Sequence, residues 1–255
     1  MNLILLEERE RADRSWVTLT DARATHLLDV LRVTSGQTVR VGVIDGPLGT
    51  GTVQEAGSGR VTMQCVFETQ TPPRPRVDVL LALPRPKVMR RLWAQFAALG
   101  VGQIILTNAS RVERDYFDTH IVTEASYRPL LIEGLQQARD TRLPQVSIHR
   151  QFRILVEDHL DDLFSSGVRL VADPSGTTSM ANALAGRHER ILLAIGPEGG
   201  WNEFELHLLE AHGFTRIGMG PRTLRVDTAC TALIAVAHAT LTPSSARATV
   251  LNRDV

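Results

Sequence analysis

The sequence predicts an α/β protein in which a small antiparallel β domain precedes a larger domain built on a parallel sheet. Short β-rich runs separated by turn residues fill residues 38–67. The proline-rich segment Thr71-Pro72-Pro73-Arg74-Pro75-Arg76 follows and marks a boundary. Beyond it, unbroken apolar runs alternate with segments of helical period, which is typical of a parallel sheet covered by helices on both faces. We therefore expect domains at residues 1–71 and 76–243.

The composition excludes several classes of protein. The 255 residues include 28 Lys+Arg and 28 Asp+Glu, so no bulk charge draws the chain to a polyanion or a membrane surface. The longest apolar runs, such as residues 77–83, are far shorter than the ~20 residues that span a bilayer. Residues 1–11 do not resemble a secretory signal. We expect a cytoplasmic protein with no membrane segment.

The cysteines and histidines indicate neither a metal site nor a nucleophile. Cys65 and Cys230 lie far apart in apolar segments, with no Cys or His at ligand spacing. We expect both to be buried, reduced thiols. The eight histidines are scattered, and no serine occupies a Gly-x-Ser-x-Gly turn. The sequence therefore predicts no metal and no covalent catalysis.

The first domain is predicted to be a small antiparallel sheet or barrel with one helix. Strands are expected at residues 38–44, 51–55 and 60–67, joined by turns rich in glycine. Thr20 or Asp21 can cap a helix that precedes these strands. One side of that helix carries His26, Leu27, Val30 and Leu31.

The second domain is predicted to alternate strands with helices. Its strands are expected at residues 77–83, 103–106, 146–149, 168–172, 191–195 and 214–219. Its helices are expected at residues 87–99, 123–138, 154–164, 179–185, 203–212 and 228–241. Gly100 ends the first of these helices, and Asp78 interrupts the first apolar run.

A glycine-rich loop follows the strand at residues 191–195. It reads Gly196-Pro197-Glu198-Gly199-Gly200, and Asn202 with Glu205 then resembles a capping box at the start of a helix. Ligands of α/β sheets bind beyond the carboxyl ends of strands, and glycines allow the backbone to approach them closely. The alternative is a plain turn from strand to helix.

A second loop, residues 220–228, carries two arginines. Arg222 and Arg225 lie three residues apart and could hold an anion or the polar edge of a base. The alternative is that both are solvated or paired with Asp227. No Walker phosphate loop is present, and the glycines near residue 220 do not complete a dinucleotide fingerprint.

A locally basic segment covers residues 74–91. This segment contains several cations and a single acidic residue, Asp78, although the chain is neutral overall. This pattern favours a directed nucleic-acid surface, and the alternative is a solvated helix face after a linker. The cations are Arg74, Arg76, Arg85, Lys87, Arg90 and Arg91.

The two loops together resemble the signature of a known family. They read Ile195-Gly196-Pro197-Glu198-Gly199-Gly200 and Gly220-Pro221-Arg222-Thr223-Leu224-Arg225-Val226-Asp227-Thr228-Ala229. His26-Leu27-Leu28-Asp29-Val30-Leu31-Arg32 and Leu99-Gly100-Val101 match as well. Over nearly its whole length the chain resembles the RsmE family. These SPOUT-class methyltransferases modify N3 of a uridine in 16S ribosomal RNA with S-adenosylmethionine.

The resemblance implies a fold, a methyl donor and partners. It implies a PUA-like RNA-binding β-barrel at residues 1–71, followed by a SPOUT methyltransferase domain whose parallel sheet ends in a C-terminal trefoil knot. It also implies a homodimer formed through the knot, and 16S rRNA or the small ribosomal subunit as partner. The residues that would bind S-adenosyl-L-methionine are Ala172, Ile195, Gly196, Pro197, Gly199, Gly200, Met219, Gly220, Leu224, Thr228 and Ala229.

Catalytic and RNA-binding roles follow from the chemistry of such a reaction. Loss of the N3 proton spreads negative charge over the uracil carbonyls, which a guanidinium can stabilise. We expect Arg225, with Arg222 nearby, to hold this charge, and Glu198 or water to accept the proton. The expected RNA-binding residues are Arg32, Arg74, Arg85 and Arg90.

The chain also departs from the usual pattern of the family. Residues 3–6 replace the common N-terminal Arg-Phe/Tyr pair, and Gln95 and Ala98 replace the common Lys and Glu. Residues 136–140 read Gln-Gln-Ala-Arg-Asp in place of Glu-Gln-Ser-Gly-Arg, and Asp227 replaces a Glu. These changes cluster where RNA would be held rather than in the donor loops. The alternatives are a SPOUT methyltransferase for another RNA site and a non-catalytic RNA-binding module of ribosome assembly.

Overall fold

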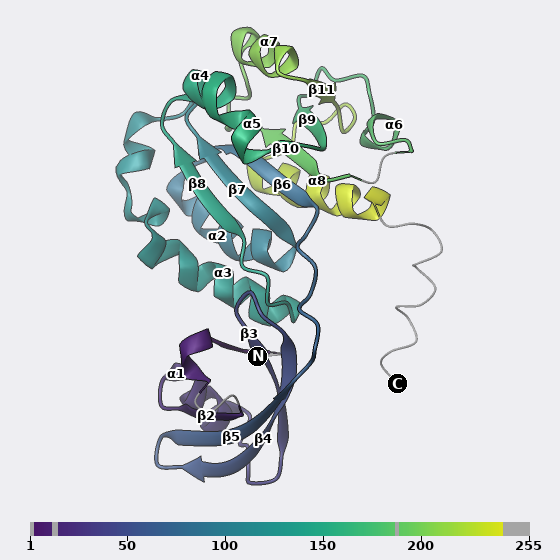
Figure 1. The fold of residues 1–255 in the computed structure, drawn as a ribbon. Coiled ribbons are helices and arrows are strands. Elements are labelled where there is room, and N and C mark those ends of the chain that lie inside the picture. The colour runs from purple at the N-terminus through teal and green to yellow at the C-terminus, as the bar shows by residue number, and fades with distance from the viewer. Residues whose placement is uncertain (1–2, 12–14, 187–188, 242–255) are drawn as a thin grey trace. The chain divides into compact units, whose positions relative to one another are not determined.

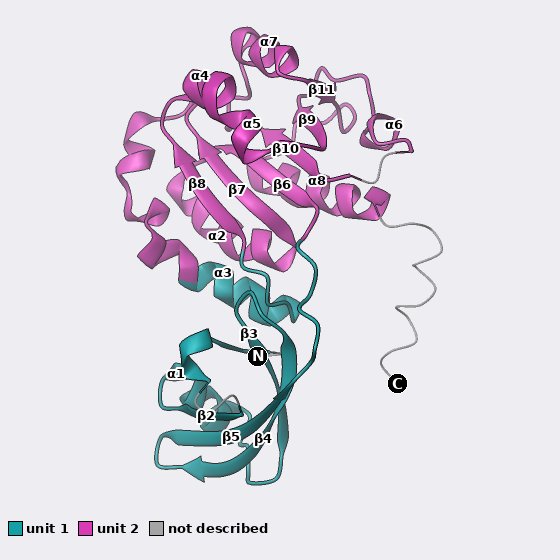
Figure 2. Cartoon of the chain, viewed as in Figure 1, with its two compact units in different colours: residues 1–74, 129–143 teal, residues 75–128, 144–255 magenta. Residues whose placement is uncertain are grey.

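The computed structural model describes residues 3–11, 15–186 and 189–241, and its chain divides into two compact units (Figures 1 and 2). Unit 1 comprises residues 1–74 and 129–143, and unit 2 comprises residues 75–128 and 144–255. The expected domains were residues 1–71 and 76–243, which place residues 129–143 in the second domain. The expected outer bounds, residues 1 and 243, lie outside the described residues. Within unit 1, the buried Thr141 donates its hydroxyl to the carbonyl of Gly46 at 2.7 Å. This contact joins the returning segment to the first β hairpin.

Unit 1 is built on a five-stranded sheet with the order β1-β3-β4-β5-β2. β1 pairs parallel with β3, and the other pairs are antiparallel. The three expected strands are confirmed, whereas β1 and β2 escaped prediction because three or four residues show too little periodicity. The bounds are β1 (Ile4–Leu6), β2 (Trp16–Leu19), β3 (Thr38–Val43), β4 (Leu48–Gly57) and β5 (Arg60–Phe67).

The single helix of this region is shorter than expected. α1 (Ala22–Thr25) begins after Asp21, whose side chain accepts the backbone N–H of Arg23 at 2.9 Å. A wider π-helical turn follows, closed by the N–H of Leu31 on the carbonyl of His26 at 3.1 Å. Leu27 is buried, but Val30 and Leu31 are exposed, so the expected single apolar side is wrong. The wide turn changes the angular spacing that a regular helix would give these residues.

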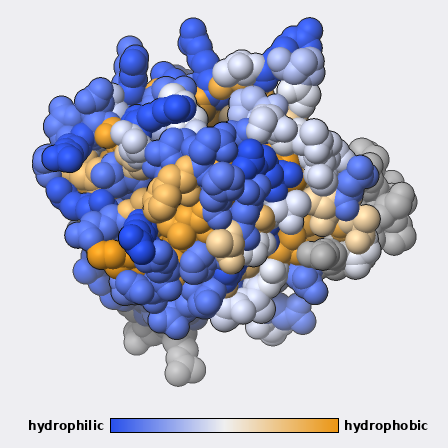
Figure 3. Space-filling model, turned by 90° about the horizontal axis from the view of Figure 1, so that it is seen from above, coloured by the Kyte–Doolittle hydropathy of each residue, from blue (hydrophilic) through white to orange (hydrophobic). Residues whose placement is uncertain are grey.

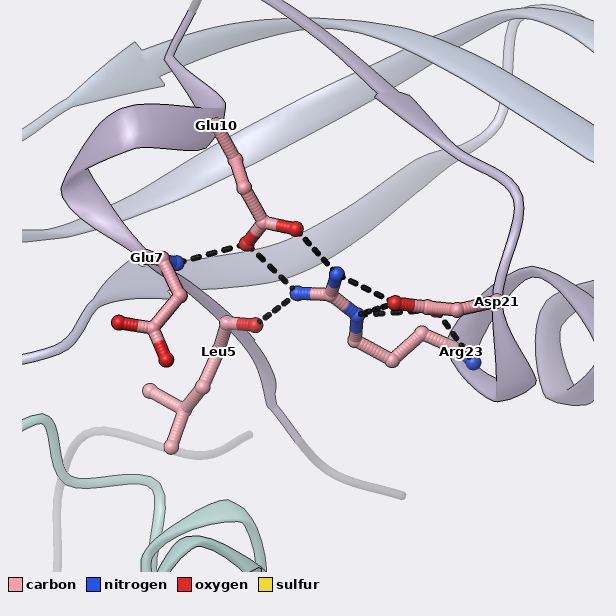
Figure 4. A network of polar contacts seen from close by, with 5 residues as sticks. All are labelled: Leu5, Glu7, Glu10, Asp21 and Arg23. Carbon is pink, nitrogen blue, oxygen red and sulfur yellow. Dashed lines mark hydrogen bonds and ion pairs between the residues drawn. The ribbon is translucent and has the colours of Figure 1, made fainter.

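A partly buried guanidinium ties the N-terminal elements of unit 1 together (Figure 4). Arg23 donates to the carbonyl of Leu5 at 2.7 Å and to the carboxylates of Glu10 and Asp21. Glu10 in turn accepts the backbone N–H of Glu7 at 2.7 Å within the 3₁₀ turn Glu8–Glu10. The hydrogen bonds from Arg23 lower the pKa of both carboxyls. One side chain therefore connects β1, the 3₁₀ turn and α1.

Unit 2 contains a six-stranded, wholly parallel sheet with the order β11-β9-β10-β6-β7-β8. Every residue of β6, β7 and β10 is buried, which confirms that the central strands are covered on both faces. The strands are β6 (Val77–Ala82), β7 (Val101–Thr107), β8 (Gln145–His149), β9 (Val168–Ala172), β10 (Ile191–Ile195) and β11 (Phe214–Ile217).

The helices of unit 2 confirm the expected alternation. The expected helix at 154–164 is divided, because a π-helical turn, Leu155–His159, separates α4 from α5. α2 packs against β7 and α8, and α8 packs against β6 and β10. None of the helices formed by the described residues could span a membrane. The helices are α2 (Pro86–Ala98), α3 (Glu124–Ala138), whose residues 129–138 belong to unit 1, α4 (Phe152–Ile154), α5 (Leu160–Leu163), α6 (Met180–Ala183), α7 (Glu203–Ala211) and α8 (Val226–Leu241).

Asp78 is the buried acid of the central sheet. Its carboxylate pairs with Arg190, and burial raises its pKa to about 6 against the opposing effect of that guanidinium. A Cβ on Gly102 would lie 2.9 Å from Asp78 Oδ1, so β7 can pass Asp78 only with glycine at this position. The register of β6 and β7 shifts between Val77 and Val79. Asp78, the polar residue within the apolar strand β6, thus lies where the register of β6 and β7 shifts.

Candidate active site

The first glycine-rich loop joins β10 to α7 in a fixed geometry. Gly200, at φ +71°, donates its N–H to the carbonyl of Pro197 at 2.8 Å. Asn202 Oδ1 then accepts the N–H of Glu205 at 2.8 Å, and Glu205 Oε2 accepts the N–H of Asn202 at 2.9 Å. This is the expected capping box. The turn is therefore closed internally before any neighbour is considered.

Two neighbouring loops hold the first loop from outside. Glu198 Oε1 accepts the backbone N–H of Arg85, which precedes α2, at 3.1 Å. The loop after β7 makes two contacts: the guanidinium of Arg111 donates to the carbonyl of Gly199, and the N–H of Ser110 donates to Glu205 Oε1 at 2.6 Å. Glu205 is only 3% exposed, so its carboxylate joins two loops from a buried position. The capping pattern gave no sign of this second role.

The second loop, after β11, is anchored at its ends. Gly218 donates its N–H to the carbonyl of Thr178 at 3.0 Å, and its α-carbon lies so close to the carbonyl of Gly176 that no side chain fits there. At the far end, Asp227 pairs with Arg91 at 2.6 Å, and the hydrogen bond from Arg91 lowers the pKa of Asp227. Between these anchors Gly220 adopts φ +93°, a conformation that favours glycine.

The two arginines of the second loop are exposed. Among the described residues, neither guanidinium has a hydrogen-bond or ion-pair partner. Asp227, the partner considered for Arg222 and Arg225, is occupied by Arg91. The alternative in which these arginines pair with Asp227 is therefore wrong, whereas the alternative in which both are solvated agrees with their exposure.

The two loops line one pocket at the carboxyl ends of β9, β10 and β11. It holds about 690 Å³ of empty space, a volume that includes the open solvent at its mouth. Of the residues predicted to bind the donor, all but Gly199 and Thr228 line it. Glu198 and Arg222 also line it, whereas Arg225 does not. The predicted roles of these residues stay predictions, but the structure brings most of them together.

Several lining residues were not predicted. Asp173 and Pro174 follow β9, Trp201 follows the first loop, and the others lie on β11, the second loop and α8. The one sequence feature that could have indicated Asp173 as a pocket residue is its place directly after a predicted strand, because a single Asp belongs to no recognisable motif. The missed residues are Asp173, Pro174, Trp201, Ile217, Thr223, Val226 and Leu233.

The pocket suits a ligand that is part apolar ring and part charged chain. Ile195, Ile217 and Leu224 give it apolar walls, and Asp173, Glu198 and Arg222 give it charged groups. A Cβ on Gly196 would lie 3.2 Å from Trp201 Nε1, so glycine allows the indole to pack against this loop. That buried indole nitrogen has no hydrogen-bond partner within the described residues.

The predicted RNA-binding arginines lie in both units. Arg32, at φ +51°, and Arg74, which lies 3.5 Å from Asp45, belong to unit 1. Arg85 and Arg90 are exposed on unit 2.

Figure 3 shows apolar residues gathered among hydrophilic ones on the face seen from above. α4 and α7 lie at the top of unit 2 in Figure 1, where Ile154 and Phe204 are exposed.

The cysteines are buried, as expected. Burial raises the pKa of the Cys65 thiol to about 11 and that of the Cys230 thiol further still. Neither is a poised thiolate. Within the described ranges, no three His, Cys, Asp or Glu side chains are grouped to hold a metal ion.

Comparisons with known proteins point to one family. An RNA methyltransferase domain matches residues 71–238. Ribosomal RNA small subunit methyltransferase E of Treponema pallidum is 31% identical over 248 residues, which cover 94% of this chain and 92% of that protein. The enzyme of the same name from Mycobacterium tuberculosis is 25% identical over 206 residues, covering 80% of this chain and 79% of its own.

Solved structures share the fold. Ribosomal RNA small subunit methyltransferase E from Neisseria gonorrhoeae, bound to S-adenosyl methionine, superposes with a TM-score of 0.76 at 21% identity and covers 94% of this chain and 97% of its own. A methyltransferase from Legionella pneumophila in complex with the same cofactor gives a TM-score of 0.73 at 19% identity, covering 94% and 97%.

Proposed function

The chain belongs to the ribosomal RNA small subunit methyltransferase E family, and from this premise we propose that it transfers the methyl group of S-adenosylmethionine to N3 of a uridine in 16S ribosomal RNA. The observation that carries the proposal is the pocket between the two loops. It combines apolar walls, the glycines of the two loops and charged side chains. Two relatives of the same fold hold this donor in their own structures.

The residues of the pocket fit the donor. S-Adenosylmethionine supplies a methyl group on a positively charged sulfur, beside an adenine ring and a charged amino-acid chain. The apolar walls at Ile195, Ile217 and Leu224 suit the ring, and the glycines of the first loop let backbone groups reach its polar edge. We assign donor binding to the predicted residues, with Trp201 added to them.

The protein must then prepare the acceptor. Arg222 lines the pocket without a partner, so its guanidinium can stabilise the charge on a deprotonated uracil. Glu198 also lines it and retains Oε2 to accept the proton, directly or through water, because Oε1 accepts from Arg85. Arg225 lies on the same loop, outside the lining residues, and its predicted role remains part of the proposal. No thiol is required for attack by a ring nitrogen.

The larger architecture follows from the same family. We assign unit 1 a PUA-like, RNA-binding role, and unit 2 a SPOUT fold with a trefoil knot in its C-terminal region. The crossing of Gly176 and Gly218, too close for any side chain, supports a threaded arrangement of these segments. A homodimer formed through the knot, acting in the cytoplasm, completes the proposal.

RNA would be held mainly through its phosphates. Arg32, Arg74, Arg85 and Arg90 are the proposed contacts. Because each phosphate contact releases counterions, RNA affinity should fall steeply as salt rises. An extruded or single-stranded target base would then reach the pocket.

The decisive experiment maps the methyl group. The full chain is incubated with methyl-labelled S-adenosylmethionine and either 16S rRNA or small ribosomal subunits, and the product is located by mass spectrometry. N3-methyluridine in 16S rRNA supports the proposal. A methyl group elsewhere overturns the assigned site in favour of another RNA target. RNA binding without donor binding in calorimetry indicates a non-catalytic assembly module instead.

A further inference from the structure

Asp173 supplies the donor pocket with a carboxylate that has no assigned role. It follows β9 directly, and the register of β9 with β10 pairs the preceding residue, Ala172, with Ile195. Asp173 therefore lies beside the start of the first loop, and it lines the pocket. Its side chain is half-buried, so one edge remains open.

A tight turn fixes the orientation of this carboxylate. Asp173 Oδ1 accepts the backbone N–H of Ser175 at 2.8 Å and also the hydroxyl of Ser175. The N–H of Asp173 donates to the carbonyl of Ile217 at 3.0 Å, and its carbonyl accepts the N–H of Gly176 at 3.0 Å. Gly176 then packs against Ile217 and Gly218 so closely that a Cβ could not be placed. The carboxylate is held from the β9 side and the β11 side together.

The second oxygen of Asp173 is unpaired. No donor among the described residues reaches Oδ2, and this atom is not buried away from the pocket or solvent. The neighbouring cation, Arg216, is engaged by Glu210 at 2.9 Å and by Ser175 Oγ at 3.2 Å. Its guanidinium therefore supports the turn and makes no hydrogen bond to the carboxylate, although the two opposite charges attract each other through space.

We propose that the Asp173 carboxylate, held at the pocket with one oxygen unpaired, favours the positively charged methyl donor over its neutral product. The inference rests on the proposed function. S-Adenosylmethionine and S-adenosylhomocysteine share adenine, ribose and amino-acid groups, and differ by the methyl group and its positive charge. A fixed negative charge in a largely apolar pocket attracts the first and is indifferent to the second. Asp173 thus assists exchange of product for donor after each transfer.

The test measures binding of both ligands by calorimetry. Asp173→Asn removes the charge but keeps an oxygen that can accept from Ser175, so the turn is preserved. We expect the affinity for S-adenosylmethionine to fall about tenfold and that for S-adenosylhomocysteine to change less than about threefold. Glu203→Gln removes a charge from the exposed first turn of α7, outside the pocket lining, and should change neither. Asp173→Glu restores the charge and should restore the preference.

The outcomes separate the possible errors. Equal weakening of both ligands by Asp173→Asn would mean that the carboxylate reads a shared group, such as the ribose, and would overturn the proposal. So would unchanged binding of both. If Asp173→Asn still binds S-adenosylhomocysteine, the variant is folded. If it binds neither ligand, the Asp173→Glu variant provides the test, because it keeps the negative charge. Loss of the preference for S-adenosylmethionine in Asp173→Glu would contradict the inference. If the unaltered protein binds neither ligand, the proposed function fails first.

Discussion

The two loops of the pocket are built on different principles. The first, residues 196–202, is closed by its own capping box and tied to two neighbouring loops through Glu198, Gly199 and Glu205. The second, residues 220–228, is fixed by backbone contact at Gly218, just before it, and by the ion pair of Asp227 near its end. Between those points its two arginines have no partner in the described part of the chain.

This difference separates two tasks of a transferase. The first loop is organised without a ligand, so it can bind the donor with little ordering cost. The second loop keeps unpaired guanidiniums, which contribute little to folding and are free to meet charge that develops on the acceptor. Changes in the first loop should therefore affect stability and donor affinity together, whereas loss of either arginine of the second loop should affect the reaction alone.

The largest effect is expected from the second loop. Arg222→Ala should slow methyl transfer about a hundredfold, the usual loss when one stabilising donor is removed, while the free energy of unfolding changes by less than about 0.5 kcal/mol. Single-turnover rates with 16S rRNA and urea unfolding measure the two quantities.

Arg225→Ala is the matched comparison for this change. It removes the same charge from the same loop at a residue outside the pocket lining, and we expect a smaller loss of rate. A larger loss of rate with Arg225→Ala would show that Arg225, and not Arg222, stabilises the charge on the uracil. Unchanged rates in both variants would show that neither arginine of this loop does so.

The next effect is expected in the first loop. Glu205→Ala leaves the N–H groups of Ser110 and Asn202 without their acceptor, which should lower the free energy of unfolding by about 2–3 kcal/mol. Donor affinity should fall about tenfold, because the loop loses its fixed position. Urea unfolding and calorimetry test both. Glu203→Ala, in the same helical turn but exposed, should leave both unchanged; equal effects would deny Glu205 its bridging role.

The same contrast explains what could be predicted from the sequence. Strands β9 and β10 were predicted to the residue because short, mainly apolar runs that end at glycine or at charged residues leave little choice of bounds. The two loops were found because glycine and proline have few uses other than tight turns and close approaches. Local composition is sufficient for features of this kind.

What could not be predicted depends on contacts across the fold. Ser110 and Glu205 are 95 positions apart, so no local pattern shows that they share a hydrogen bond. Asp173 is an ordinary residue until β11 packs beside it. Val30 and Leu31 were placed on the apolar side of a regular helix, and a single π-helical turn overturned that placement. These features arise from tertiary structure, where periodicity carries no information.

A smaller effect is expected from the outer tie of the first loop. Arg111→Ala removes an exposed hydrogen bond to the carbonyl of Gly199, which is worth about 0.5–1.5 kcal/mol. Because the capping box and Glu205 remain, we expect donor affinity to fall only about threefold. Arg153→Ala, which removes an exposed arginine from α4 away from the pocket, is the control. A loss as large as that of Glu205→Ala would mean that the outer tie, and not the buried one, fixes the loop.

The smallest effect is expected at the far anchor of the second loop. The pKa of Asp227 lies below its ordinary value of 3.8 because Arg91 donates to it, so the pair stabilises the fold above about pH 3.8. That contribution is lost as the pH falls through the lowered pKa, when the carboxyl becomes protonated. Since Arg91 is half exposed, the difference should stay below about 1 kcal/mol. Urea unfolding at pH 5 and pH 3 should give a slightly steeper loss for the unaltered protein than for Arg91→Ala. If the free energy of unfolding falls equally between pH 5 and pH 3 in both proteins, the second loop is held only by backbone contact at Gly218 and by the helix α8.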